Sequence, residues 1–241
     1  IFRQAMQALL DNAIAGNPGH HQLAAITMAL VMDDVDGATR PNSLDMVEYT
    51  YYGGYAPAGY VFSNFLTRDG GGFEGPGYDR IKFDYVEVAK RMEVLRARHA
   101  ERLDVRRYPP LLDEPKAQAM YDFFIDITLL DAFAPEVGDA GGARLKPGFI
   151  PPRFVSNYPH FYADGFRLYR EPRYAAALLG VKGEMPAGGN LFEPSVEAEA
   201  RQAATPVRFE TRLLDDYGFA FLRGATSEVM TNYSALKGHQ Q

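Results

Sequence analysis

Over most of the first 180 residues, apolar side chains recur at steps of three and four positions. This spacing places them on one face of an α-helix. In residues 80–98, for example, Tyr85, Val88 and Met92 share one face, whereas residues 21–34 are apolar almost all round, as in a buried helix. We predict helices over residues 2–14, 21–34, 80–98, about 115–133, 161–169 and 173–179.

Long polar or Gly/Pro-rich connections separate these helices, at residues 35–43, 53–77, 135–157 and 180–206. Connections above about 15 residues are uncommon in compact domains and usually have a function or lack order. Several of them are rich in aromatic residues, namely Tyr51, Tyr52, Tyr55, Tyr60, Phe149, Phe154 and Tyr158. We therefore expect packed loops that line a surface.

The period changes after about Pro206, where Val207, Phe209, Thr211 and Leu213 alternate with polar residues as in a β-strand. The turn signal "DDYG" follows, and "FAFLR" and "EVMTNYS" are expected to be the next antiparallel strands. Helices followed by a run of strands indicate two architectures in series. The pattern predicts a boundary within residues 183–206.

Composition narrows the class of protein. Of the 241 residues, 46% are hydrophobic and 23% are charged, which is ordinary for a globular protein with a sizeable core. No apolar run approaches the roughly 18 residues of a membrane span, and a net charge of −6 argues against a nucleic-acid partner. The absence of cysteine excludes disulfides and cysteine metal sites. Because the chain opens inside a helical pattern without Met and stops at "KGHQQ", we expect it to be a fragment of a longer protein.

The stretch "RDGGGFEGPGYDRIKFDY" carries the strongest candidate chemistry. A glycine-rich stretch precedes Tyr78, and Arg80 follows two residues later. The cation of Arg80 can lower the pKa of the phenol. Such a tyrosine can pass a proton to or from a substrate. The alternative is a tyrosine packed at a helix start, with Asp79 and Arg80 as solvated charges and Glu74 as a cap or loop carboxylate.

The histidines form a second candidate. His20 and His21 precede the most hydrophobic helix, after the turn residues Asn17 and Gly19. A helix start has unpaired N–H groups that favour an anion. The alternative is that Asn17 caps the helix and His21 is an ordinary residue near the surface.

The other three histidines carry weaker signals. His99 is expected to be solvated on a charged helix end, and His160 to cap or pack. His239 follows a predicted strand, which by itself indicates little. The chain also lacks a complete P-loop, a GxSxG elbow and an HExxH zinc helix.

Taken together, five segments in order resemble the heparinase II/III-like polysaccharide lyases, a family that includes oligoalginate lyases. They are "NPGHHQLAAITMALVMDD", "DGGGFEGPGYDRIKFDYVEVAKRMEVL", "PEVGDAGGARL", "RLLDDYGFAFLRG" and "NYSALKGHQQ". The resemblance implies a mainly α fold: an (α/α) toroid of antiparallel helical hairpins, followed by the first strands of an antiparallel β-sandwich. The toroid part would span residues 1–185, a linker 186–206 and the sandwich part 207–241.

The resemblance implies β-elimination at a uronic acid of an anionic polysaccharide. Tyr78 would be the acid and also a candidate base, and His239 would be its partner base or a group on the carboxylate side. His21, or His20 or Asn17 beside it, would neutralise the C5 carboxylate, and Arg80 would bind substrate acid groups. The family also implies a periplasmic or secreted protein. We expect no cofactor and no metal at this site.

Two other functions stay open. One is a carbohydrate-binding toroid without catalysis. The other is a glycoside hydrolase on an (α/α) scaffold, which needs two opposed carboxylates. Glu74 and Asp139 are the pair that the sequence offers for that role.

Overall fold

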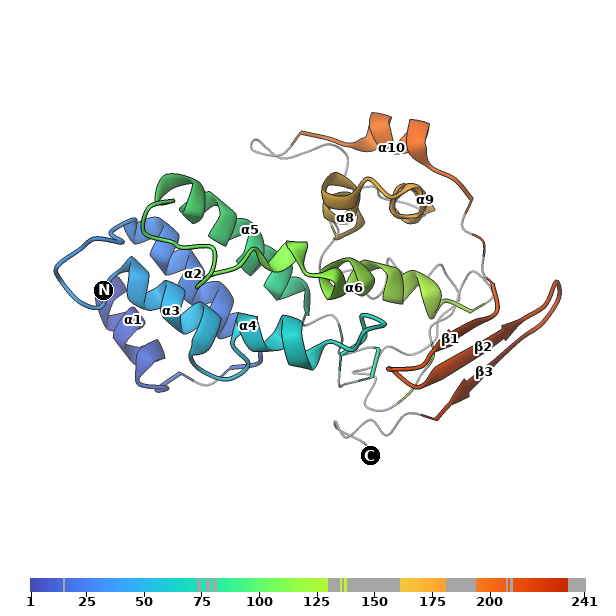
Figure 1. Cartoon of the computed structure of the whole chain (residues 1–241), viewed down its shortest axis with the longest axis horizontal. Coiled ribbons are helices and arrows are strands. Elements are labelled where there is room, and N and C mark those ends of the chain that lie inside the picture. Colours follow the sequence, from blue (N-terminus) through green and yellow to red (C-terminus); the bar gives the residue numbers. More distant parts are fainter. Residues whose placement is uncertain are drawn as a thin grey trace. The chain divides into compact units, whose positions relative to one another are not determined.

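Helices account for most of the described residues in the computed structural model of the chain, and strands occur only near residue 220 (Figure 1). The structure describes residues 1–14, 16–72, 75, 76, 79, 82–129, 135, 137, 161–180, 194–206, 208 and 210–233. The helices are α1 (Phe2–Leu10), α2 (His20–Met32), α3 (Ser43–Tyr52), α4 (Ala58–Tyr60), η1 (Val61–Phe65), α5 (Lys82–Arg98), η3 (Leu111–Asp113), α6 (Pro115–Asp126), α8 (Phe161–Tyr169), α9 (Pro172–Gly180) and α10 (Glu197–Ala203). The strands are β1 (Arg212–Leu214), β2 (Phe219–Arg223) and β3 (Glu228–Asn232). The prediction of a mainly helical chain followed by antiparallel strands is confirmed.

The chain forms two compact units, and each contains two separate stretches of sequence. Unit 1 comprises Ile1–Phe65 and Ile81–Ala117, and unit 2 comprises Leu66–Arg80 and Gln118–Gln241. The limits of these two units differ from the domain boundary that the sequence predicts within residues 183–206. That domain boundary stays a prediction. None of the described helices is long and apolar enough to cross a membrane.

In unit 1, α2 packs against both α3 and α5. Its Ala25, Ile26 and Ala29 are fully buried, as its nearly uniform apolar sequence predicted. The two alanines carry little side chain, which lets neighbouring helices approach closely. α2 is therefore the central helix of this unit.

A buried polar joint connects the end of α2 to the start of α3. Ser43 is fully buried, and its hydroxyl donates to the carbonyl of Ala29 and to Asp34 Oδ1, both at 2.8 Å. Asp34 also accepts from the Ser43 N–H at 2.9 Å and from Arg3 at 2.7 Å. Burial alone would raise the pKa of Asp34, but these donors outweigh burial and hold that pKa below its usual value. The joint sets the turn between the two helices.

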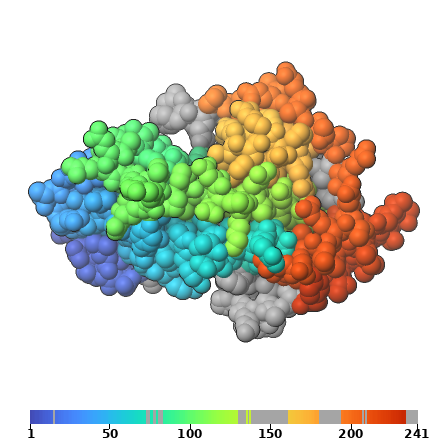
Figure 2. Space-filling view, in the orientation of Figure 1, coloured from blue at the N-terminus to red at the C-terminus, as the bar shows by residue number. Residues whose placement is uncertain are grey.

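In unit 2, an aromatic core fills the space between α6, α8, α9 and the sheet. Tyr121 stacks on Phe161 with ring centroids 4.2 Å apart. On the sheet side, Phe123 lies 4.6 Å from Tyr217, which lies 4.7 Å from Phe219. α10 packs on α9, and in Figure 2 the orange atoms of the α10 region lie next to the gold atoms of the α8–α9 region.

The sheet is antiparallel with strand order β1–β2–β3. In β2, Phe219 and Phe221 are fully buried, and because they stand two positions apart they lie on the same face of the sheet. On the other face, Leu222 pairs with Val229, and both side chains are more than half exposed.

The glycine-rich segment is held against the turn between β1 and β2. Asp69 Oδ2 accepts from the N–H groups of Asp216 and Tyr217 at 2.8 and 2.9 Å. Asp216 accepts in return from the Arg68 N–H at 2.6 Å. Gly70 has a φ of +85°. A Cβ there would overlap the carbonyl of a residue in α6, and a Cβ on Gly71 would overlap the Tyr217 ring.

Several predicted boundaries are wrong. α1 ends at Leu10 rather than at residue 14, because Asn12 adopts a positive φ of 52°. Helix α6 ends at Asp126 rather than near 133, and β1 begins at Arg212 rather than at 207.

Three predicted connections also contain or adjoin helices. Tyr51 and Tyr52 belong to α3, and Tyr60 ends α4. α10 occupies part of the predicted 180–206 connection. The aromatic connections are thus partly helical, and Tyr51 is almost fully buried.

We expect Gly71→Ala to destabilise the protein by about 2 kcal/mol or more, because the added methyl must displace Tyr217 and Phe123 in a packed core. Urea unfolding followed by circular dichroism measures this change. Gly224→Ala is the matched control, since its Cβ would meet only Ser227 O at 3.3 Å. Equal stabilities of the two variants would show that the close approach at Gly71 carries no strain.

We expect Asp34→Asn to lower the free energy of unfolding at pH 7 by about 1–3 kcal/mol, because an amide replaces a carboxylate that accepts from Ser43 and Arg3. The folded pKa of Asp34 lies below the unfolded value, so its stabilisation is present above about pH 4 and is lost as the pH falls through the folded pKa. Urea unfolding at several pH values should show the gap to wild type closing in acid. Asp36→Asn, at an exposed pair with Arg102, should change stability by about 0.5 kcal/mol or less at any pH.

Candidate functional site

Three of the predicted site residues, Asn17, His20 and His21, lie in the part of the chain that the structure describes. The other predicted site residues lie outside it: Glu74, Tyr78, Arg80, Asp139 and His239. His160 also lies outside the described residues. The structure therefore describes the start of α2 and parts of the glycine-rich segment.

α2 begins at a glycine cap. Gly19 has a φ of +90°, and its N–H donates to the side-chain oxygen of Gln22 at 3.3 Å. A Cβ on Gly19 would lie 2.9 Å from the Cβ of Asp84 in α5, so only glycine fits there. Asn17 is exposed, and its carbonyl accepts from the His20 N–H at 3.3 Å. The alternative in which Asn17 caps the helix is wrong.

His20 lies at the surface beside a buried carboxylate. Its Nε2 is 3.3 Å from Oδ2 of Asp84, whose side chain is 4% exposed, whereas that of His20 is 57% exposed. A buried charge is costly unless it has a partner, and this carboxylate lies within reach of the imidazole. The arrangement restrains the His20 ring at the N-terminal end of α2.

His21 is half-buried, and its Nε2 atom has no hydrogen-bond partner among the described residues. The backbone of Gly16 lies against the ring, since a Cβ on Gly16 would come within 2.6 Å of Nε2. An unpaired buried nitrogen costs about 1–3 kcal/mol. Such exceptions are uncommon in native proteins and call for an explanation, such as a functional role.

An aromatic loop is fastened next to these histidines. The buried Gln22 donates to the carbonyl of Tyr55 at 3.1 Å, and the Tyr85 hydroxyl donates to the carbonyl of Ala56 at 2.7 Å. The Tyr55 side chain is 70% exposed. Burial, and then the charge of Asp84, raise the pKa of Tyr85 well above its usual value. This phenol therefore stays protonated and has a structural role.

The glycine-rich segment, which belongs to unit 2, is closed by an aspartate. The Gly72 N–H donates to both carboxylate oxygens of Asp79, at 2.9 and 3.0 Å, and the Asp79 N–H donates to the Gly75 carbonyl at 3.2 Å. Asp79 is 2% exposed. The alternative that makes Asp79 a solvated charge is therefore wrong, and its carboxylate holds together the ends of the segment that carries Tyr78 in the sequence.

His99 also differs from its prediction as a solvated residue. Its Nε2 lies 2.6 Å from Oδ1 of Asp33, and its side chain is 22% exposed. The hydrogen bond from His99 is the main reason that the pKa of Asp33 lies below its usual value. His99 is a structural residue of unit 1.

The sequence did not single out Gln22, Asp84 or the buried role of Asp79. Gln22 stands three positions after the cap, the place where a side chain reaches back to the helix start, so that signal was available. Asp84 gives no such signal, because its burial depends on the packing of α5 on α2. Among the described residues, no three His, Asp or Glu side chains are grouped as a metal site.

We expect Gln22→Leu to cost about 1–3 kcal/mol of stability, because it removes the partner of the buried Gly19 N–H and of the partly buried Tyr55 carbonyl. Amide hydrogen exchange should accelerate in residues 53–57. Gln7→Leu is the matched control, since the side chain of the exposed Gln7 bonds only to Asp11, the residue after α1, among the described residues. If exchange in residues 53–57 stayed at the wild-type rate, Gln22 would not be what fastens the aromatic loop.

Comparisons of the chain with protein-family models, with curated proteins and with solved structures found no match. The resemblance noted from the sequence therefore stays an expectation. What can be said of function rests on the residues and on the geometry of the described site.

Proposed function

We propose that the chain is part of a lyase that cleaves a uronic-acid-containing polysaccharide by β-elimination. The observation that carries the proposal is the start of α2, where an exposed His20 is followed by a half-buried His21 whose Nε2 has no hydrogen-bond partner among the described residues. The sequence resemblance supports it independently, because the same two histidines fall in a matching segment.

This arrangement suits a sugar acid. The N-terminal end of a helix favours negative charge, and two imidazoles there add donors for a carboxylate. Gln22, the next residue of α2, binds the backbone carbonyl of Tyr55, whose exposed ring offers a flat apolar surface with a polar tip. Donors that face a developing negative charge in a site prepared for it supply a large share of catalysis.

In the proposed reaction, His21 binds the C5 carboxylate of the uronate, with His20 or Asn17 as the alternative donor. A base, Tyr78 or His239, removes the C5 proton. The electron pair of that C–H bond forms the C4–C5 double bond as the C4–O4 bond breaks. Tyr78 gives a proton to the departing O4, and Arg80 binds an acid group of the substrate.

A direct assay of the full-length protein tests the proposal. Incubation with alginate, heparinoids and other uronate polymers should yield a product with a new C4–C5 double bond, which absorbs in the ultraviolet. New reducing ends without this absorbance would indicate the hydrolase, and binding without any cleavage would indicate a carbohydrate-binding toroid. Either outcome overturns the lyase.

We expect His21→Ala to reduce kcat by about 10²–10³-fold if His21 stabilises the charge that develops on the carboxylate. Tyr78→Phe should abolish turnover. His99→Ala is the matched control, because it removes an imidazole from the same unit at a structural pair, and it should retain wild-type kcat. A His21→Ala enzyme with normal kcat would move the neutralising role to His20 or Asn17, and a fully active Tyr78→Phe enzyme would remove Tyr78 from the mechanism.

A further inference from the structure

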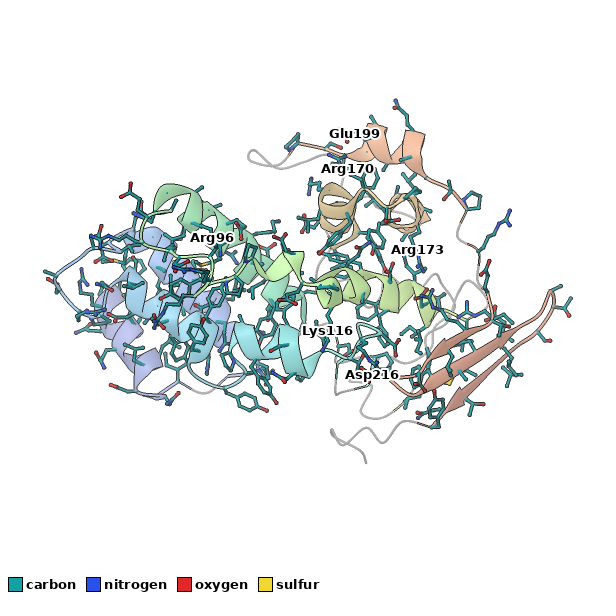
Figure 3. All side chains as sticks on the ribbon, viewed as in Figure 1. Arg96, Lys116, Arg170, Arg173, Glu199 and Asp216 are labelled. Carbon is teal, nitrogen blue, oxygen red and sulfur yellow. The ribbon has the colours of Figure 1, made fainter. Side chains whose placement is uncertain are left out.

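A second polar centre lies in unit 2, at the C-terminal end of α6. Asp126 is 7% exposed. Its Oδ1 atom accepts from Arg173 of α9 at 2.5 Å and from Arg212 of β1 at 2.8 Å. Its backbone carbonyl accepts from Arg223 of β2 at 2.6 Å. Figure 3 shows Arg173 between α9 and α6.

These arginines line a cavity of about 770 Å³, which we call the arginine pocket. This volume falls within the roughly 300–1,000 Å³ of small-molecule sites and is far larger than the roughly 30 Å³ share of one water. Its lining residues are Asp126, Arg173, Thr205, Pro206, Arg208, Glu210, Thr211, Arg212 and Arg223.

Among the described residues of this lining, positive charge exceeds negative charge, with four arginines against Asp126 and Glu210. Asp122, outside the lining, lies 3.3 Å from Arg173. Burial raises the pKa of both Asp122 and Asp126 despite the nearby arginines. Carboxylates of the protein therefore neutralise the charge of Arg173, but they do not neutralise all four guanidinium groups.

Two of the arginines have donors to spare. Arg208 is exposed and has no hydrogen bond or ion pair with any described residue. Arg212 is 47% exposed, and among the described residues it donates only to Asp126. A guanidinium group has five N–H donors in a fixed plane, so most of those on Arg212 are available to a ligand.

The other two arginines are held in place. Arg173 is fixed by Asp122 and Asp126. Arg223 is fixed by the Asp126 carbonyl, and its guanidinium lies 4.9 Å from the centre of the Phe221 ring. Groups that are already ordered lose little entropy when a ligand binds, and the arginine fork matches the geometry of carboxylate, sulfate and phosphate.

We propose that the arginine pocket binds a small organic oxyanion, a molecule of about disaccharide size that carries a carboxylate, sulfate or phosphate group. Arg208 and Arg212 bind the oxyanion directly, and Asp126 orients Arg212 and Arg173. The site is separate from the histidines of α2 and does not depend on a β-elimination activity. It gives the chain a second place for acidic ligands.

Titration calorimetry on the full-length protein tests this proposal without any turnover. The probes are a uronate disaccharide, a sulfated disaccharide and a phosphorylated disaccharide, each compared with a neutral disaccharide at equal ionic strength. At least one acidic probe should bind, and binding should weaken as sodium chloride rises, because salt screens charge interactions. Which probe binds most tightly identifies the oxyanion. Absence of binding by all three acidic probes, or equal binding of the neutral disaccharide, overturns the proposal.

Variants locate the site. Arg208→Gln combined with Arg212→Gln should weaken binding of the best acidic probe at least about tenfold, a loss of about 1.4 kcal/mol. Arg106→Gln removes one positive charge from an exposed arginine of unit 1 and should leave the affinity unchanged. If the double variant fails to fold, the exposed Arg208→Glu variant alone should still weaken binding. Wild-type affinity in the pocket variants, or an equal loss in Arg106→Gln, would place the oxyanion elsewhere.

The outcome is independent of the lyase proposal. Failure of the β-elimination assay leaves the calorimetry unaffected. A lyase whose pocket variants bind the acidic disaccharide normally would overturn only the proposal for the arginine pocket.

Discussion

The close contact of Gly70 and Gly71 with α6 and the Tyr217 ring is the constraint on which the rest of unit 2 depends. No larger residue fits at these two positions, so the backbone there has one available path. Asp69 then binds the N–H groups of the β1–β2 turn, which fixes where the sheet begins. The glycines thus serve the packing of the protein itself, and the segment they open is closed again by Asp79.

Buried carboxylates organise both candidate sites. Asp84 lies beside His20 in unit 1, and Asp126 gathers three arginines in unit 2. A carboxylate removed from water needs donors around it, so each one draws cationic or polar side chains from different elements to a single point. Both sites therefore depend on the burial of a carboxylate as much as on the local sequence. The same physics explains why a surface arginine such as Arg208, without such a partner among the described residues, stands out.

Periodicity predicted the helices whose apolar face is continuous, such as α5, α8 and α9, to within one or two residues. It missed α3 because the run of tyrosines before Gly53 resembled a loop, although Asn42 and Asp45 form a capping box that the sequence contains. The two histidines of α2 could be identified from their position before a hydrophobic helix. Asp84 and the arginine pocket could not, because they join residues far apart in the sequence through tertiary packing. No period or motif in a single sequence records such contacts.

The alternation of the chain between its two units has a consequence for the order of events during synthesis. Asp69 leaves the ribosome early, yet the amides it binds belong to residues 147 and 148 positions further on. The contacts of Gly70 and Gly71 likewise form only after α6 and Tyr217 have been synthesised. Contacts between distant residues form slowly and leave segments exposed in the meantime. The nascent chain therefore carries the glycine-rich segment in an unfinished state until the β1–β2 turn has been translated, and a chain shortened before that turn cannot complete it.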